Sequence, residues 1–168
     1  MKYCPQCTKP LGEVLVDGGS QLGCPDADCG YVYWNNPIPI VAMIVEVTGG
    51  VVLAHNVAWP KTFYSIITGF LEAKEDPLDC AIRETREELG LRAVESSLVG
   101  AYSFPEQNQV IIAYHIRAEG DIALNHELDH YKIVPREDLK AWKMGTGLAI
   151  SDWLRQQGHE PESIDLRG

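Results

Sequence analysis

Three glutamates, Glu84, Glu87 and Glu88, follow one another at spacings that join residues one turn apart on a helix. Three carboxylates on one arc of a helix repel one another, at a cost of roughly a few tenths of a kcal/mol per pair. Arg83 borders the arc and cannot neutralise all three. A hard divalent cation such as Mg²⁺ or Mn²⁺ prefers oxygen ligands and keeps coordination positions for substrate phosphates. Considered alone, the run also fits a solvated acidic helix face.

A second group of residues that could do chemistry is Cys4, Cys7, Cys24 and Cys29. In a reducing compartment such clustering indicates metal ligands rather than disulfides. Two thiolates from each of two turns can form a closed tetrahedral Zn²⁺ site, which would be structural and not catalytic. The glycine-rich stretch between the pairs reads as a short β-hairpin, and a segment so poor in large apolar side chains needs the ion for stability. The alternative is four reduced cysteines without a metal.

The elements that must position the glutamates begin with a helix at 77–89. Asp76 is a suitable N-cap, Pro77 fits the first helical position, and Gly90 fits the position just after the end. Helical periodicity predicts a buried stripe that includes Ile82 and Thr85. The spacing of β-branched runs and turns predicts a second helix at 146–157 and strands at 38–47, 51–54, 63–67, 99–103, 110–117 and 131–134.

Strands outnumber helices and do not alternate with them regularly, which favours an α+β fold over a doubly wound α/β fold. The cysteine-rich start and the change of composition after it predict two domains, at 1–34 and 35–168.

The 168 residues carry 24 acidic and 14 basic side chains, for a formal charge of −10. This excess disfavours sequence-independent binding to nucleic acid or anionic lipid. No apolar run reaches the roughly 20 residues that span a bilayer, and no apolar leader follows Met1, so we expect no membrane contact and a cytoplasmic location.

The segment from Gly69 to Leu91 resembles the Nudix box of the Nudix hydrolases. Gly69 is followed after five residues by Glu75, and after seven more by Arg83-Glu84-Thr85-Arg86-Glu87-Glu88-Leu89-Gly90-Leu91. Every fixed polar position of the box is present. The departure is Thr85, where the family has an aliphatic residue, and we expect its hydroxyl to bond the backbone carbonyl one turn back.

The resemblance implies a Nudix-type mixed β-sheet sandwiched by helices. It also implies a pyrophosphohydrolase that acts on a nucleoside diphosphate linked to another moiety, such as NADH, FAD or ADP-ribose. Mg²⁺ or Mn²⁺ would be held by Glu84, Glu87 and Glu88, with the Gly69 carbonyl as a further ligand. Arg83 would orient the acidic cluster, and Glu75 would brace the loop or coordinate through water.

Other candidate site residues lie outside the box. A last acidic ligand often comes from a late loop in these domains, and Glu127 is the best match, with Glu106 as the runner-up. Either could also activate the attacking water. Phe70, Trp34 and Phe104 are candidates for stacking on a substrate ring, although each also fits a place in the core.

The four-cysteine segment followed by Tyr31-Val-Tyr-Trp-Asn-Asn-Pro37 is similar to the zinc-ribbon group of Nudix hydrolases, which includes NADH diphosphatases and FAD or ADP-ribose pyrophosphatases. The NADH diphosphatase signature Ser-Gln-Pro-Trp-Pro-Phe-Pro is incomplete here, where residues 102–109 read YSFPEQNQ. The resemblance also suggests dinucleotide-capped RNA as a substrate and a homodimer as the assembly. The alternative function is a zinc-ribbon module that binds nucleic acid or protein, with a non-catalytic box.

Three further motifs carry weaker interpretations. His126-Glu-Leu-Asp-His130 matches a metalloprotease string, but that chemistry needs both histidines on one helix, and a strand is predicted here. Cys80 fits a buried filler better than a nucleophile. Gly145-Thr146-Gly147 precedes a predicted helix and could present N–H groups to a phosphate, or could simply start the helix.

Overall fold

The computed structural model describes residues 1–165. Two compact units are present, Met1–Asn36 and the chain from Pro37 onward. The division falls two residues after the boundary predicted from composition.

The N-terminal unit is a small antiparallel sheet of β1 (Gly12–Val16), β2 (Gly19–Gly23) and β3 (Val32–Tyr33). Asp17 and Gly18 both have positive φ, of 50° and 81°, which matches the type I′ turn favoured between two hairpin strands. The side chains buried in this unit are those of Cys4 and Cys24. Its interior is therefore made of thiols rather than of aliphatic groups.

The second unit is built on a six-stranded mixed sheet in the order β7-β8-β4-β5-β9, with β6 also paired to β4. β4 runs parallel to β8, and the other pairings are antiparallel. The strands are β4 (Ile38–Val47), β5 (Gly50–Asn56), β6 (Ile67–Phe70), β7 (Arg92–Phe104), β8 (Gln109–Glu119) and β9 (Leu128–Val134); the remaining elements are α1 (Pro77–Leu89), η1 (Pro105–Gln107), η2 (Arg136–Asp138), β10 (Ala141–Trp142), α2 (Thr146–Gln156) and β11 (Ser163–Ile164).

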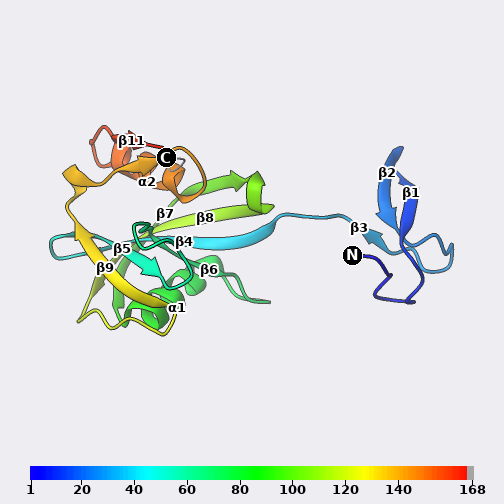
Figure 1. Ribbon diagram of the computed structural model, residues 1–168, viewed down its shortest axis with the longest axis horizontal. Helices are drawn as coiled ribbons and strands as arrows, with labels where there is room; N and C mark the ends of the chain where they lie inside the picture. The colour runs from blue at the N-terminus through cyan, green and yellow to red at the C-terminus, as the bar shows by residue number, and fades with distance from the viewer. Residues whose placement is uncertain (166–168) are drawn as a thin grey trace. The chain divides into compact units, whose positions relative to one another are not determined.

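One helix covers each face of this sheet (Figure 1). Alternate residues of β4 enter two separate cores, because successive side chains of a strand point to opposite faces. Val41 and Met43 pack in the cluster that contains residues of α1, whereas Ala42 and Ile44 pack in the cluster that contains residues of α2. The predicted α+β sandwich is therefore confirmed.

Several predicted strands have other bounds in the structure: the strand expected at 131–134 begins at Leu128, and those expected at 51–54 and 110–117 are longer, as Gly50–Asn56 and Gln109–Glu119. The two largest differences lie elsewhere. The strand expected at 63–67 lies at Ile67–Phe70, preceded by an isolated bridge between Ala54 and Ser65. The strand expected at 99–103 starts earlier, at Arg92. Its first half is polar, and its pairing with β8 shifts register twice, so neither apolar content nor clean alternation marks it in the sequence.

Helix α1 has the predicted ends: the Asp76 carboxylate accepts from the Leu78 N–H at 2.8 Å, and Gly90 is left-handed with φ of 70°. The Thr85 hydroxyl donates to the Ala81 carbonyl at 2.7 Å, which confirms the predicted bond. The predicted buried stripe is wrong at Ile82, which is 39% exposed. Glu88 is buried instead, because the buried arc of the helix is turned toward its acidic edge.

Neither α1 nor α2 is long and apolar enough to cross a membrane, and no other helix among residues 1–165 is.

Candidate active site

The acidic edge of α1 opens onto a cleft of about 650 Å³. Strands β5 and β6, helix α1 and the loop before β9 each contribute to its wall. The lining residues are Asn56, Thr68, Gly69, Phe70, Glu72, Arg83, Glu84, Glu87, Glu88, Asn125, His126 and Glu127. The fold thus brings the three glutamates of the box to the same cleft as Gly69 and Glu127, which lie far apart in sequence.

Arg83 is held in a fork by Glu75. Its Nε donates to Glu75 Oε1 at 2.7 Å and its Nη2 to Oε2 at 3.0 Å. The guanidinium of Arg83, together with the backbone N–H of Glu72, lowers the pKa of Glu75 to about 2. Nη1 of Arg83 also donates to Glu84 at 2.7 Å and to Glu87 at 3.1 Å. The Arg83 guanidinium therefore orients the carboxylates of Glu84 and Glu87, while its two bonds to Glu75 balance its positive charge.

Glu88 lies deepest in the acidic group, only 9% exposed. Burial, together with the nearby charges of Glu84, Glu127 and Glu87, raises its pKa to about 8. Burial also raises the pKa of Glu84, in spite of its bond to Arg83. A set of carboxylates that is short of positive charge and partly dehydrated is the donor set that a divalent cation such as Mg²⁺ or Mn²⁺ fits.

Gly69 is required by the position of Glu84. A Cβ atom at residue 69 would lie 2.2 Å from Cδ of Glu84 and 2.3 Å from its Oε1. Gly69 itself is held in β6, opposite Val41 of β4. The missing side chain at Gly69 is thus the space that the Glu84 carboxylate occupies.

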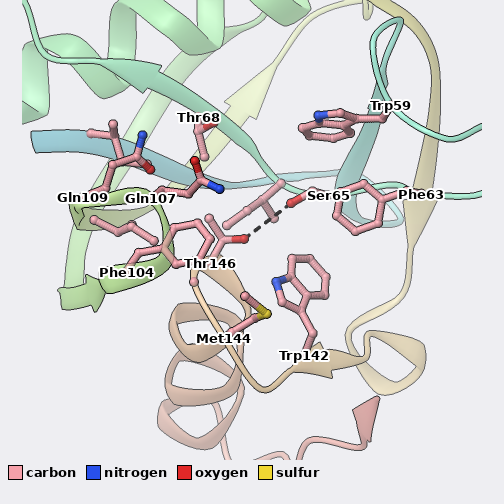
Figure 2. Close-up of a pocket in the computed structure, with 14 residues that line it drawn as sticks. Trp59, Phe63, Ser65, Thr68, Phe104, Gln107, Gln109, Trp142, Met144 and Thr146 are labelled. Atoms are coloured by element: carbon pink, nitrogen blue, oxygen red, sulfur yellow. Dashed lines mark hydrogen bonds between the residues drawn. The ribbon is translucent and has the colours of Figure 1, made fainter. Parts of the chain in front are cut away.

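A second cleft, of about 550 Å³, lies on the face of the sheet that α2 covers. Figure 2 shows Trp59, Phe63 and Trp142 around one part of it, and Phe104 with two glutamines around another. None of its lining residues is charged. They are Ile40, Trp59, Phe63, Ser65, Ile66, Thr68, Phe104, Gln107, Gln109, Ile111, Trp142, Met144, Gly145 and Thr146.

The two clefts meet at Thr68, which lines both. A smaller cavity of about 50 Å³ is bordered by Trp59 from the aromatic side and by Glu88 and Glu127 from the acidic side. A ligand with an anionic part and a flat ring could therefore reach both clefts at once.

The residues predicted for stacking separate in the structure. Phe104 lines the aromatic cleft, whereas Phe70 lines the acidic cleft and is 62% exposed. Trp34 belongs to the N-terminal unit, where it is 53% exposed. Of the two late acids, Glu127 lines the acidic cleft; Glu106, in η1, lines neither cleft.

Most residues that line the aromatic cleft were not predicted as site residues from the sequence. Trp59 and Phe63 come from the loop between β5 and β6, and Trp142 from the two-residue strand β10. Gln107 comes from η1, and Gln109 from the start of β8. No spacing in the chain links these segments. Phe104, predicted for stacking, and Gly145-Thr146, a candidate phosphate contact, both lie in this cleft, as do Gln107 and Gln109 from the stretch 102–109.

The four cysteines of the N-terminal unit converge as predicted. Cys4 Sγ lies 3.6 Å from Cys29 Sγ, Cys7 Sγ lies 3.4 Å from Cys24 Sγ, and all four sulfurs lie within 4.8 Å of one another. Tetrahedral Zn²⁺ with bonds of about 2.3 Å needs sulfurs roughly 3.8 Å apart. The donor set and its spacing therefore fit Zn²⁺.

Comparison with known proteins agrees with this site. A family model described as NUDIX domain matches residues 36–152. The chain is 28% identical over 139 residues to the NAD-capped RNA hydrolase NudC of Pseudomonas fluorescens, covering 82% of this chain and 45% of that protein. It is 26% identical over 117 residues to NudC of Mycobacterium tuberculosis, covering 68% and 36%. The chain thus spans less than half the length of these relatives.

Among solved structures, a NUDIX hydrolase from Nitrosomonas europaea superimposes with a TM-score of 0.74 at 25% identity, covering 98% of this chain and 99% of that one. The family match spans well over half of the chain and includes the whole acidic cleft. The chain belongs to the Nudix hydrolase family.

Proposed function

We propose that this protein hydrolyses the pyrophosphate bond of a nucleoside diphosphate linked to a second moiety, in a reaction that depends on Mg²⁺ or Mn²⁺. The observation that carries the proposal is the meeting of the two clefts at Thr68. One cleft is strongly acidic and suits a metal-bridged diphosphate, and the other is neutral and aromatic and suits a flat ring.

The acidic cleft supplies the ligands. Glu84, Glu87, Glu88 and Glu127, with the Gly69 carbonyl, would hold the divalent ion, which would neutralise the diphosphate and lower the pKa of a nearby water. Arg83 keeps two of these carboxylates in place through its bonds to Glu84 and Glu87. Attack of water on one phosphorus breaks the bridging P–O bond and leaves two phosphate-terminated products. Glu127 is our candidate for accepting the proton of that water, because it lies at the exposed mouth of the cleft.

In this proposal the aromatic cleft binds a ring of the substrate and so selects which moiety is linked to the diphosphate. Its volume suits a purine, nicotinamide or flavin ring, and its uncharged lining offers no cation to a second anionic group. Gln107 and Gln109 offer amide donors and acceptors that can read a ring edge. We therefore propose NADH, FAD or ADP-ribose as the substrate class.

A NAD cap on RNA is a second candidate, because the relatives named above are NAD-capped RNA hydrolases. The same two clefts would hold the cap. The formal charge of −10 offers little attraction to the RNA that follows it. In the N-terminal unit, Lys9 is already paired with Asp26, which also weighs against a nucleic-acid-binding ribbon.

The proposal is tested by product analysis with NADH, NAD, FAD, ADP-ribose and NAD-capped RNA, each with Mg²⁺. We expect cleavage of ring-bearing diphosphates into two phosphate-terminated products. Trp59→Ala should raise KM by about fivefold to 150-fold, because a lost stacking partner costs roughly 1–3 kcal/mol. Trp34→Ala tests separately the stacking role predicted for Trp34, and an unchanged KM in that variant would argue against the role. Absence of cleavage across the panel, in a protein that binds Mg²⁺, would contradict the proposal.

Replacement of Gly69 by Ala tests the acidic cleft in another way. The added Cβ meets the flexible end of Glu84, which can swing aside, so we expect only about 1 kcal/mol of lost stability. The displaced carboxylate should lower turnover by about tenfold to a hundredfold. The measurement is kcat together with the free energy of unfolding. Gly12→Ala is the control, since a Cβ there meets no atom within 4 Å. A wild-type kcat in Gly69→Ala would count against Glu84 as a metal ligand.

We further propose that the N-terminal unit is a zinc ribbon with a structural Zn²⁺. A tetrathiolate site needs reduced cysteines, which supports a cytoplasmic location. The homodimer implied by the family remains a prediction, which light scattering in solution can check.

A further inference from the structure

Three metal-ligating side chains converge outside the acidic cleft, on the pair of strands β5 and β9. They are His55, Asp129 and His130, and their ligand atoms all lie within 4.8 Å of one another. Nδ1 of His55 lies 2.5 Å from Asp129 Oδ1, and Nδ1 of His130 lies 3.2 Å from the same oxygen.

A break in the strand pairing creates this arrangement. His55 pairs with His130, but the next residue, Asn56, pairs with Leu128, so Asp129 is an extra residue in β9. Such a bulge places two residues of one strand opposite one residue of the other and re-aims their side chains. Asp129 and His130 therefore both reach His55, which a regular alternation of faces would prevent.

The surroundings prepare His55 for coordination. It is only 4% exposed, and its Nε2 lies 3.2 Å from the Pro60 carbonyl. A hydrogen bond from Nε2–H to a carbonyl fixes the ring and directs Nδ1 at the cluster, the arrangement usual for metal-bound imidazoles. Lys132 lies two residues beyond His130, but its Nζ is placed 3.9 Å from the centre of the Tyr64 ring.

We propose that His55, Asp129 and His130 form a binding site for a divalent transition metal such as Zn²⁺ or Ni²⁺. Two imidazoles and one carboxylate suit these ions, whereas Mg²⁺ prefers oxygen ligands alone. The ion would take the place of the direct contact between His55 Nδ1 and Asp129 Oδ1. Because Asp129 and His130 are exposed, the remaining coordination positions would face solvent. The site differs from the protease string noted in the sequence, since His126 lines the acidic cleft instead.

The test uses the full chain with its cysteines loaded with Zn²⁺ and with excess Mg²⁺ to occupy the acidic cleft. Ni²⁺ is titrated by calorimetry into the wild type, His130→Ala and the control His159→Ala. We expect one Ni²⁺ per chain in the wild type and in the control, and at least tenfold weaker binding in His130→Ala. His130 is exposed, so its replacement should leave the unfolding temperature without Ni²⁺ unchanged.

A second readout is the unfolding temperature, which bound Ni²⁺ should raise in the wild type and in His159→Ala but not in His130→Ala. No Ni²⁺ binding by the wild type, or equal affinity in His130→Ala, would overturn the proposal. Neither outcome bears on hydrolysis at the acidic cleft.

Discussion

Glu88→Gln is expected to lower kcat by about a thousandfold or more and, in zinc-loaded protein without Mg²⁺, to raise stability at neutral and higher pH. The loss of turnover follows from the removal of a buried carboxylate ligand, since metal-ion catalysis supplies several kcal/mol and each 1.4 kcal/mol is worth about tenfold. The gain in stability has a separate origin. In the wild type the ionised Glu88 is dehydrated and faces the charges of Glu84, Glu127 and Glu87.

The sign of the pH dependence follows from the pKa of Glu88, which is about 8 in the folded protein against 4.5 as its ordinary value. The folded state therefore holds this proton more tightly than the unfolded state does. The stabilisation that Glu88 contributes is full below about pH 4.5 and is lost as the pH rises toward 8, by an amount on the order of 5 kcal/mol. Glu88→Gln should remove this decline, and Mg²⁺ should reduce it in the wild type.

The measurement is urea unfolding of zinc-loaded protein between pH 5 and 8, with and without Mg²⁺, alongside kcat. Glu95→Gln makes the same chemical change at an exposed ion pair with Arg117 and should alter neither quantity much. If Glu88→Gln and the wild type lost stability in parallel as the pH rose, Glu88 would not be the dehydrated carboxylate described above. Wild-type kcat in a folded Glu88→Gln protein would refute the assigned catalytic centre.

What the sequence could predict here depends on how local the signal is. Helix α1 is marked by its own residues, from Asp76 at the N-cap to Gly90 at the end, and both ends are found where expected. The cysteine pairs are equally local, because each pair sits in a single turn. Glu127 could be placed only through the family resemblance, since nothing near it in the chain points to the glutamates of α1.

The parts that escaped prediction are set by tertiary contacts. The aromatic cleft is assembled from Trp59, Phe104 and Trp142, which share no periodicity and meet only when the sheet and α2 are in place. The bulge at Asp129 is likewise a property of the pairing between β5 and β9, and not of either strand alone. Helix periodicity gave the right helix but the wrong buried edge at Ile82, because the position of the helix against the sheet decides which edge is covered.

Cys24→Ser is expected to abolish zinc binding by the cysteines and to unfold the N-terminal unit while the second unit stays folded. Structural Zn²⁺ contributes an apparent 10–16 kcal/mol in small zinc-finger peptides at about neutral pH. Here it would replace an aliphatic core, because Cys4 and Cys24 are the side chains that the unit buries. The second unit has two apolar cores of its own, one on each face of its sheet.

Zinc content and amide hydrogen exchange measure the two expectations separately. Backbone bonds such as Cys24 N–H to the Tyr31 carbonyl, at 2.8 Å, should lose protection in Cys24→Ser, whereas amides of β4 should keep theirs. Cys80→Ser is the matched control, because Cys80 is a buried thiol of α1 that lies outside the cysteine cluster. With both variants made in the His130→Ala background, so that the second proposed site takes up little zinc, it should retain one zinc per chain. A Cys24→Ser protein with an ordered β1–β2 hairpin and stoichiometric zinc would show that the sulfurs converge without serving as the ligand set, and the stability of the ribbon would then need a source other than the ion.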